Sequence, residues 1–320
     1  MTKKTFTFES IFNSNLLNNN IIKAHLALLG ANVIYGANYI IAKDIMPHKI
    51  GPAAFVFLRI VAASILFWLI KATIKEKVEK KDFLRLIVCG LLGVATNQLF
   101  FFHGLNLTSP IDASIIITTI PVLVLIFSAF ILKERITSNK ILGLIIGGIG
   151  AIILITYGNK AGGTSSVLGN VFVFCNACSY ALYLVLVKPL MSKYNALTVI
   201  SWVFLFGFFW MFPFGISDFL QTNFTEFDLS TWLTVGFVVL FTTFFAYLFN
   251  IYALNYVSPS VNGSYVYLQP AVSFIMVSIY AYVLMKDAYA QDINLIKILS
   301  CVLVVSGVYL ISRKPKKTLI

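Results

Sequence analysis

Charged residues are scarce in this sequence. Only 11% of its 320 residues are Asp, Glu, Lys or Arg, whereas a soluble domain carries roughly 25%. So few charges cannot cover the surface of a large soluble core. The residues between them form long apolar runs, and a run of about 18 apolar residues is long enough to cross a bilayer as a helix. We therefore predict a protein that spans the lipid bilayer.

Residue types that bind metals or carry catalysis are also few. The chain has three His and four Cys. Cys175 and Cys178 have the spacing of a redox or metal pair, but no second pair and no nearby His completes a site, so we interpret them as helix-packing residues. The apolar runs contain no pair of carboxylates that could serve a membrane-embedded enzyme. We therefore expect that the protein binds no metal or cofactor and is not an enzyme.

Alternating hydrophobicity, the mark of a membrane-spanning strand, is absent, and an open sheet cannot sit in lipid. Ten apolar segments are each near the length that a ~30 Å hydrocarbon core requires of a helix. We therefore predict an all-α membrane protein with ten transmembrane helices. They cover residues 24–43, 52–71, 83–103, 111–132, 139–157, 167–187, 197–215, 231–252, 259–284 and 292–311.

The net charge of +12 comes from basic residues in short loops, so it indicates topology and we expect no nucleic-acid partner. With the N-terminus inside, eighteen of the 24 Lys and Arg residues fall on the cytoplasmic side and four on the other. Both termini are therefore predicted to be cytoplasmic. Residues 1–23 are expected to form a polar tail with no removed signal peptide, and residues 312–320 a basic tail.

The segment 99–121 recurs at 248–270. Aligned without a gap, the two copies agree at seven of 23 positions. The agreements include a Ser-Pro pair and a later proline, which is Pro121 in the first copy and Pro270 in the second. The sequence therefore predicts the same unit twice: the end of one helix, a Ser-Pro turn and a second helix that contains proline.

The repeat extends over the whole chain and gives five helices per copy. Because five is odd, the second copy must cross the membrane upside down relative to the first. We predict two inverted five-helix repeats, at 24–157 and 167–311, joined by a glycine-containing linker at 158–166. In transporters built this way, the substrate site lies near the bilayer midplane between the two halves.

Several segments are similar to those of a known family. They are a Gly-Ala-Asn-Tyr sequence at 36–39, a lone Arg in the second helix, a Ser-Pro pair before the fourth, IPVLVLIFSAFILKERIT across the fourth and GLIIGGIGAIILI in the fifth. Together with the two five-helix halves, they resemble EamA-type ten-helix members of the drug/metabolite transporter superfamily over nearly the whole chain. The resemblance implies movement of small metabolites, often amino acids or related compounds, across the bacterial inner membrane.

Polar side chains recur at helical spacing in six of the expected helices, so that each set lies on one face. A polar side chain is costly in lipid, and these faces should therefore meet inside the protein. They could line a cavity or only bond neighbouring helices, and for the set as a whole we favour a cavity. The predicted substrate-binding residues are Asn32, Tyr35, Tyr39, Arg59, Asn97, Ser114, Thr118, Tyr180, Tyr183, Tyr247, Asn250, Asn262, Tyr265 and Gln269.

This predicted lining is amphipathic and rich in tyrosine, which suits a zwitterionic or weakly polar organic solute better than a phosphate. Pro121 and Pro270 each lack a backbone N–H, which frees the carbonyls of Ile117 and Val266 for a ligand or water. We expect the two prolines to act in gating. We also expect the second repeat to carry most of the substrate selectivity.

Arg59 lies about seven residues into the second helix. It either binds a substrate carboxylate, or extends to the outer interface or pairs with backbone carbonyls, and we favour the second interpretation. Lys297 in the tenth helix has the same alternatives.

The predicted function is that of a secondary transporter, an exporter, of small organic metabolites such as amino acids or related amphipathic solutes, working by alternating access. Its partners would be a small-molecule substrate and the lipid bilayer. The sequence does not indicate whether the protein is a monomer or an oligomer. The alternatives are a channel or facilitator pore and, least favoured, a membrane-embedded enzyme. Inverted copies favour two-state gating over a pore without excluding one.

Overall fold

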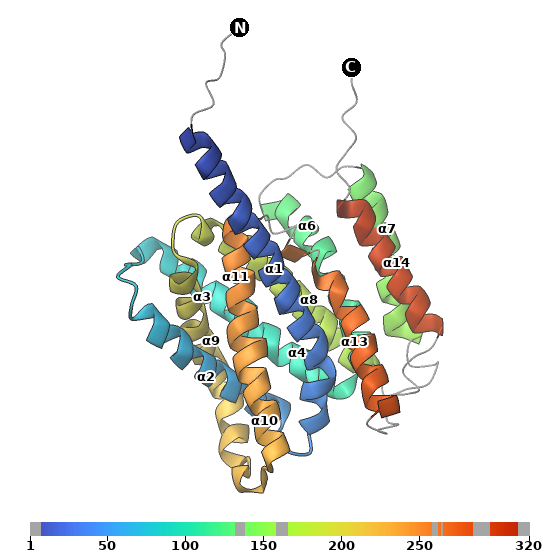
Figure 1. Ribbon diagram of the computed structural model, residues 1–320. Helices are drawn as coiled ribbons and strands as arrows, with labels where there is room; N and C mark the ends of the chain where they lie inside the picture. The colour runs from blue at the N-terminus through green and yellow to red at the C-terminus, as the bar shows by residue number, and fades with distance from the viewer. Residues whose placement is uncertain are drawn as a thin grey trace.

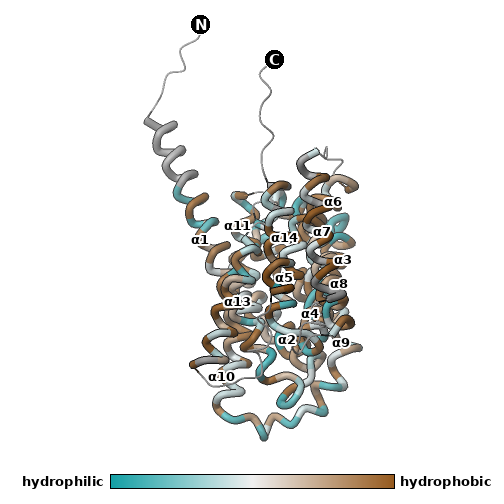
Figure 2. The backbone as a smooth tube through the Cα atoms, turned by 90° about the vertical axis from the view of Figure 1, so that its right-hand side faces the viewer, coloured by the Kyte–Doolittle hydropathy of each residue, from teal (hydrophilic) through white to brown (hydrophobic). Residues whose placement is uncertain are grey.

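The computed structural model describes residues 8–131, 138–157, 166–257, 262–263, 265–283 and 295–312, and the secondary structure in these ranges is helical. Seven helical segments of this described chain are long and apolar enough to cross a membrane, and three shorter apolar helices complete a set of ten. In Figure 2, hydrophobic residues run along the helices and hydrophilic residues gather in the loops at the lower end. The predicted all-α membrane fold is confirmed.

The ten spans follow the chain in order (Figure 1). Three of them change helix type within the span, and the fourth is split at residues 118–119. Those of the first repeat are α1 (Phe8–Ile45), α2 (Pro52–Lys71), α3 (Phe83–Gly90) continued by a π-helical segment (Leu91–Ala95) and α4 (Thr96–Leu107), α5 (Pro110–Ile117) with α6 (Ile120–Ile131), and α7 (Ser138–Tyr157). Those of the second are α8 (Val167–Met191), α9 (Ala196–Gln221), α10 (Leu229–Phe237) continued by a π-helical segment (Val238–Phe245) and α11 (Ala246–Tyr256), a 3₁₀ turn (Tyr265–Tyr267) with α13 (Leu268–Ser278) and a π-helical segment (Ile279–Val283), and α14 (Leu295–Ser312).

Two helices are longer than the sequence predicted. α1 begins at Phe8 inside the expected polar tail, because extending an existing helix adds one hydrogen bond for each residue fixed. α9 runs to Gln221 and passes through Pro213, near which the sequence predicted an end. The expected linker, the C-terminal tail and the second Ser-Pro pair lie almost wholly outside the described residues.

The packing of the helices is two-fold symmetric. α1 packs against α11 and α13, whereas its counterpart α8 packs against α4, α5 and α6. α2 packs against its own repeat mate α9, and α7 against α14, which lie together along one edge of the bundle (Figure 1). Exchanging the two repeats therefore reproduces the same contacts. The prediction of two inverted five-helix repeats is confirmed.

The turn between the third and fourth spans shows why the Ser-Pro pair recurs. Thr108 and Ser109 are extended, the Ser109 hydroxyl accepts a hydrogen bond from the Asp112 N–H at 3.0 Å, and Pro110 occupies the first turn of α5. Ser at the N-cap and Pro at the first helical position are both favoured, because the first N–H groups of a helix have no partner within it. The sequence thus ends one span and starts the next within three residues.

A fully buried ion pair joins the two repeats at this turn. Lys297 Nζ of α14 lies 2.9 Å from Asp112 Oδ1 of α5, and both side chains are 0% exposed. Lys297 also donates to Ser109 Oγ at 3.2 Å, and Asp112 Oδ2 accepts from Asn170 Nδ2 of α8 at 3.4 Å. The interpretation that Lys297 extends to the interface is therefore wrong, since the side chain is buried beside Asp112.

A second, solvent-exposed cluster joins the repeats at the opposite end. Lys193, after α8, lies 2.8 Å from a Glu79 carboxylate oxygen and 2.6 Å from one of Asp82, both in the segment that leads to α3. Hydrogen bonds from Lys193 are the main cause that holds the pKa of the Glu79 and Asp82 carboxyls below their usual values. The same bonds raise the pKa of Lys193. The Tyr194 hydroxyl also donates to Asp82 at 2.6 Å.

Asp112→Asn is expected to lower the free energy of unfolding by about 3–5 kcal/mol, because it leaves the buried Lys297 ammonium without this carboxylate. Asp112→Asn combined with Lys297→Met should recover much of the loss. Denaturant titration of the purified protein measures both, with the exposed Asp218→Asn as control. Equal stabilities for Asp112→Asn and the control would contradict a compensated ion pair.

Lys193→Gln is expected to lower the melting temperature at neutral pH more than Lys81→Gln, since Lys81 contacts Glu79 alone. Carboxyls whose folded pKa is lowered stabilise the protein above their unfolded pKa of about 4, and lose this effect as pH falls through the folded value. The difference between wild type and Lys193→Gln should therefore be level from about pH 5 to 9 and vanish in acid. Melting curves across this range test it, and a difference that grows in acid would contradict the assignment.

Candidate substrate-binding cavity

A cavity lies between the two repeats. The volume open to the centres of water molecules is about 80 Å³, which is enough for several waters or a small solute. Three lining residues, Tyr35, Phe101 and Tyr180, are half-buried and the others are buried. The lining comprises Asn32, Tyr35, Asn38, Tyr39, Arg59, Asn97, Gln98, Phe101, Phe102, Ile117, Ile120, Asn176, Tyr180, Thr242, Tyr247, Asn250, Asn262, Val266 and Gln269.

Ten of the fourteen residues predicted from the polar stripes line this one cavity. The spacing in the sequence placed each set on one face of its helix, and the fold turns those faces toward one another. Their role in binding stays a prediction. The ten are Asn32, Tyr35, Tyr39, Arg59, Asn97, Tyr180, Tyr247, Asn250, Asn262 and Gln269.

The other four predicted residues lie outside the cavity lining. Ser114 and Thr118 turn their hydroxyls to the carbonyls of Ile111 and Ile115, at 2.7 and 2.6 Å, within their own helical segment.

Tyr265 lies away from the cavity because its hydroxyl bonds His25 Nδ1 at 2.7 Å. Tyr183 packs against Gly93, where the absence of a side chain leaves room for the tyrosine ring.

Nine lining residues were not among the predicted set. Three of them, Asn38, Gln98 and Asn176, are polar neighbours of predicted residues, and the sequence signal for them was present. Thr242 sits in the π-helical segment that precedes α11, where the face of the helix cannot be read from a period of 3.6 residues. The remaining five are apolar: Phe101, Phe102, Ile117, Ile120 and Val266.

The first repeat contributes eleven of the lining residues and the second eight. Both repeats therefore line the cavity, and the expectation that the second carries most of the substrate selectivity stays a prediction. Asn32 and its repeat counterpart Asn176 both line it.

A chain of hydrogen bonds crosses the cavity wall between the repeats. The Tyr39 hydroxyl of α1 donates to Gln269 Oε1 of α13 at 2.6 Å, and Gln269 Nε2 donates to Asn32 Oδ1 at 2.7 Å. Asn32 Nδ2 in turn donates to the Leu28 carbonyl at 2.8 Å. The amide of Gln269 is thereby held in one orientation by α1.

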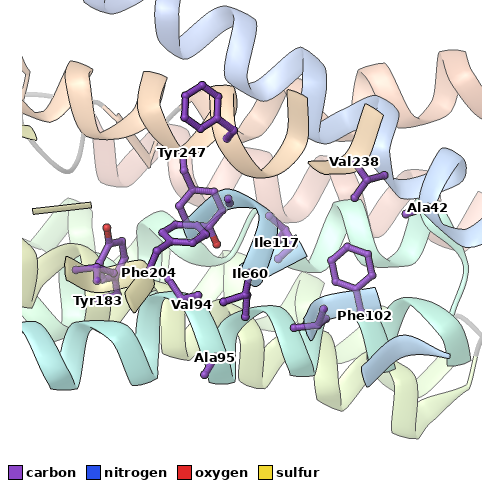
Figure 3. Close-up of a cluster of buried hydrophobic side chains, with 14 of the residues drawn as sticks. Ala42, Ile60, Val94, Ala95, Phe102, Ile117, Tyr183, Phe204, Val238 and Tyr247 are labelled. Carbon is purple, nitrogen blue, oxygen red and sulfur yellow. The ribbon is translucent and has the colours of Figure 1, made fainter. Parts of the chain in front are cut away.

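The two copies meet at Gln98 and Tyr247, which occupy the same position in the two repeats. Gln98 Nε2 donates to the Tyr247 hydroxyl at 3.4 Å, and that hydroxyl lies 3.1 Å from Asn97 Oδ1. Figure 3 shows Tyr247 extending from α11 into the core, where its ring meets Phe204 edge-on at 5.1 Å between centroids. Residues that contact their own repeat mates mark the two-fold axis, so the cavity lies on that axis.

Arg59 does not reach the interface. Its side chain is 2% exposed and lines the cavity. Nε donates to Thr243 Oγ1 at 2.8 Å, and the guanidinium carbon lies 4.2 Å from the centroid of the Phe102 ring. The interpretation that Arg59 extends outward or pairs with backbone carbonyls is therefore wrong.

Several polar atoms of the lining have no hydrogen-bond partner among the described residues. Arg59 Nη1 is a donor, the amide oxygens of Asn38, Gln98 and Asn176 are acceptors, and the Thr242 hydroxyl can donate or accept. Buried polar groups are normally paired. A solute that offers both an acceptor and donors would complete this set.

The two prolines sit at matching places beside the cavity. Each lies in the first turn of a helix that resumes after an irregular turn, at residues 118–119 before Pro121 and at Tyr265–Tyr267 before Pro270. Neither proline lines the cavity, but Ile117 and Val266, four residues earlier, both do. The breaks thus precede the prolines.

The side chains that line the cavity offer hydrogen bonds, one positive charge and aromatic surfaces to a bound solute. No Asp or Glu is among the described residues that line it. Within the described ranges there is also no group of three His, Cys, Asp or Glu residues that could hold a metal ion.

Comparisons with known proteins agree with this architecture. An uncharacterized transporter of Archaeoglobus fulgidus is 29% identical over 83% of this chain and 90% of its own length. The uncharacterized inner membrane transporter YicL of Salmonella typhimurium is 23% identical over 60% of this chain and 66% of its own length. A crystal structure with 18% identity has the same fold, with a TM-score of 0.62 over 90% of this chain and 96% of that one.

The repeats themselves match a family. Residues 22–156 and 167–313 each match the EamA-like transporter family, which accounts for nearly the whole chain in two copies. The protein is a multi-pass membrane transporter, not an enzyme, and it belongs to the EamA-like transporter family.

Proposed function

We propose that this protein is a secondary transporter, an exporter, of small amphipathic organic metabolites such as amino acids, and that it works by alternating access. The observation that carries the proposal is the cavity itself. It lies on the two-fold axis between inverted repeats, where substrate sites of such transporters are found. We further propose the bacterial inner membrane as its location, with both termini cytoplasmic.

The packing around the cavity supports two states in preference to an open pore. The repeats are joined at one end by Asp112 and Lys297 and at the other by Lys193 with Glu79 and Asp82. Separating the repeats at one end while the other stays joined would expose the cavity to one side of the membrane at a time. A channel needs both ends open at once.

The first experiment compares metabolites in cells that overproduce the protein with those in cells carrying an empty vector, in cytosol and medium separately. Export predicts a solute that falls inside and rises outside. Uptake of that solute, labelled, into vesicles then gives a rate. Passage that does not saturate with concentration would favour a pore.

Gln269→Ala is expected to lower transport about tenfold or more, because it removes the amide that links α13 to Tyr39 and Asn32 across the cavity. Tyr39→Phe, which removes one hydroxyl, should have a smaller effect in the same direction. Vesicle transport is normalised to protein amount, with the exposed Gln221→Ala and Tyr256→Phe as matched controls. Wild-type rates for both cavity variants would exclude this part of the cavity from the substrate site.

Pro121→Ala and Pro270→Ala test the proposed gating role. Alanine restores an N–H that can bond the carbonyl four residues earlier, which would close the break and stiffen the span. We expect a several-fold lower maximal transport rate with an unchanged half-saturating concentration. Unaltered maximal rates in both variants would show that the breaks do not move during transport.

A further inference from the structure

Arg59 and Lys297 are the cations of the described spans that are at most 2% exposed, and they differ in their surroundings. Lys297 lies 2.9 Å from the carboxylate of Asp112. Arg59 faces a cavity whose described lining contains no Asp or Glu. A buried charge without a counter-charge is strongly unfavourable, so its retention at a cavity wall calls for an explanation.

The guanidinium of Arg59 is held in place from two sides. Thr243 Oγ1 accepts from Nε at 2.8 Å, and the Phe102 ring lies against the guanidinium carbon at 4.2 Å. Nη1 has no partner among the described residues. The threonine hydroxyl donates onward to the Val238 carbonyl at 2.8 Å, so its own bonding does not depend on the arginine. Thr243 and Phe102 therefore position Arg59, and no described residue of the lining neutralises its charge.

We infer that Arg59 is the anchor for a carboxylate on the transported solute, and that this group supplies the counter-charge that the described cavity lining lacks. The inference rests on the proposed transport function and names the chemical class of its substrate. A carboxylate presents two oxygens that match the planar donors of a guanidinium. One arginine balances one negative charge, whereas a phosphate group with a charge near −2 would leave the cavity negative.

The rest of the lining completes the recognition. The side-chain oxygens of Gln98, Asn176 and Asn38 without partners can accept hydrogen bonds from N–H or O–H groups of the same solute. The aromatic rings of Tyr35, Tyr180 and Phe101 provide an apolar wall. The solute is thus a small carboxylate that carries hydrogen-bond donors, bound with its carboxylate at α2.

Ligand-free stability separates this role from a structural one. An uncompensated buried charge costs stability and a neutral side chain removes that cost, whereas breaking a compensated pair creates it. We expect ligand-free Arg59→Gln to melt at or above the wild-type temperature, while Asp112→Asn melts well below it. A marked fall for Arg59→Gln, similar to that of Asp112→Asn, would assign Arg59 to the fold and overturn the inference.

Ligand-induced stabilisation tests the carboxylate itself. The probes are the twenty common L-amino acids, each compared with its carboxamide, added to the purified full-length protein in a thermal-shift titration. At least one free acid should stabilise the wild type, and its amide should bind about ten- to a hundredfold more weakly, as loss of a charged hydrogen bond predicts. Arg59→Gln should lose the stabilisation, Arg59→Lys should keep part of it, and the exposed Arg85→Gln should keep all of it.

The outcomes distinguish the two proposals. Equal stabilisation by acid and amide, retention of stabilisation in Arg59→Gln, or no stabilisation by any acid each overturns the carboxylate anchor. If metabolite profiling still shows export of a neutral solute, the transport function stands and only the anchor fails. If no solute moves in any profile, the transport function fails as well.

Discussion

The constraint on which this structure depends is that lipid offers no hydrogen bonds and no counter-charge. A polar side chain within a span therefore either bonds a carbonyl of its own helix, as Ser114 and Thr118 do, or turns toward another span. The chain of bonds from Tyr39 through Gln269 to Asn32 satisfies this requirement between repeats, and Asp112 with Lys297 satisfies it for charge. The same constraint gathers the polar faces on the two-fold axis, where they surround a cavity. A cavity with a polar lining thus follows from the way the helices avoid exposing their own polar groups to lipid.

Lys297 and Arg59 show that burial of a charged side chain does not by itself reveal its structural or binding role. Lys297 and Arg59 are both almost completely removed from solvent. Lys297 forms an ion pair with Asp112 of the other repeat and joins the halves. Arg59 donates a hydrogen bond to Thr243 and lines the cavity. The position of the counter-charge distinguishes a residue that stabilises the assembly from one that is available to a ligand.

Much of this architecture could be predicted from the sequence, because the bilayer imposes a length and a polarity on each span. Helix periodicity placed ten of the predicted residues on the faces that line the cavity. It could not separate Tyr39 from its repeat mate Tyr183, because the difference depends on Gly93, a residue of another helix that accepts the Tyr183 ring. The direction of Arg59 was likewise undetermined, since Thr243 and Phe102 come from distant parts of the chain. Pairing between spans is set by packing, which a single helix pattern does not contain.

The hydrogen bond between Gln98 and Tyr247 makes the cavity wall asymmetric at the two-fold axis. In an assembly of two identical halves, a residue on the two-fold axis meets a copy of itself. Only a pair of identical side chains could then occupy this place, and a hydrogen bond from an amide to a phenol could not form. In a single polypeptide that restriction is absent, because one substitution at this position alters one side of the cavity and leaves the other unchanged. The axis is thus the place where a pair of identical halves would be least free to vary, and where this chain has an asymmetric cavity wall.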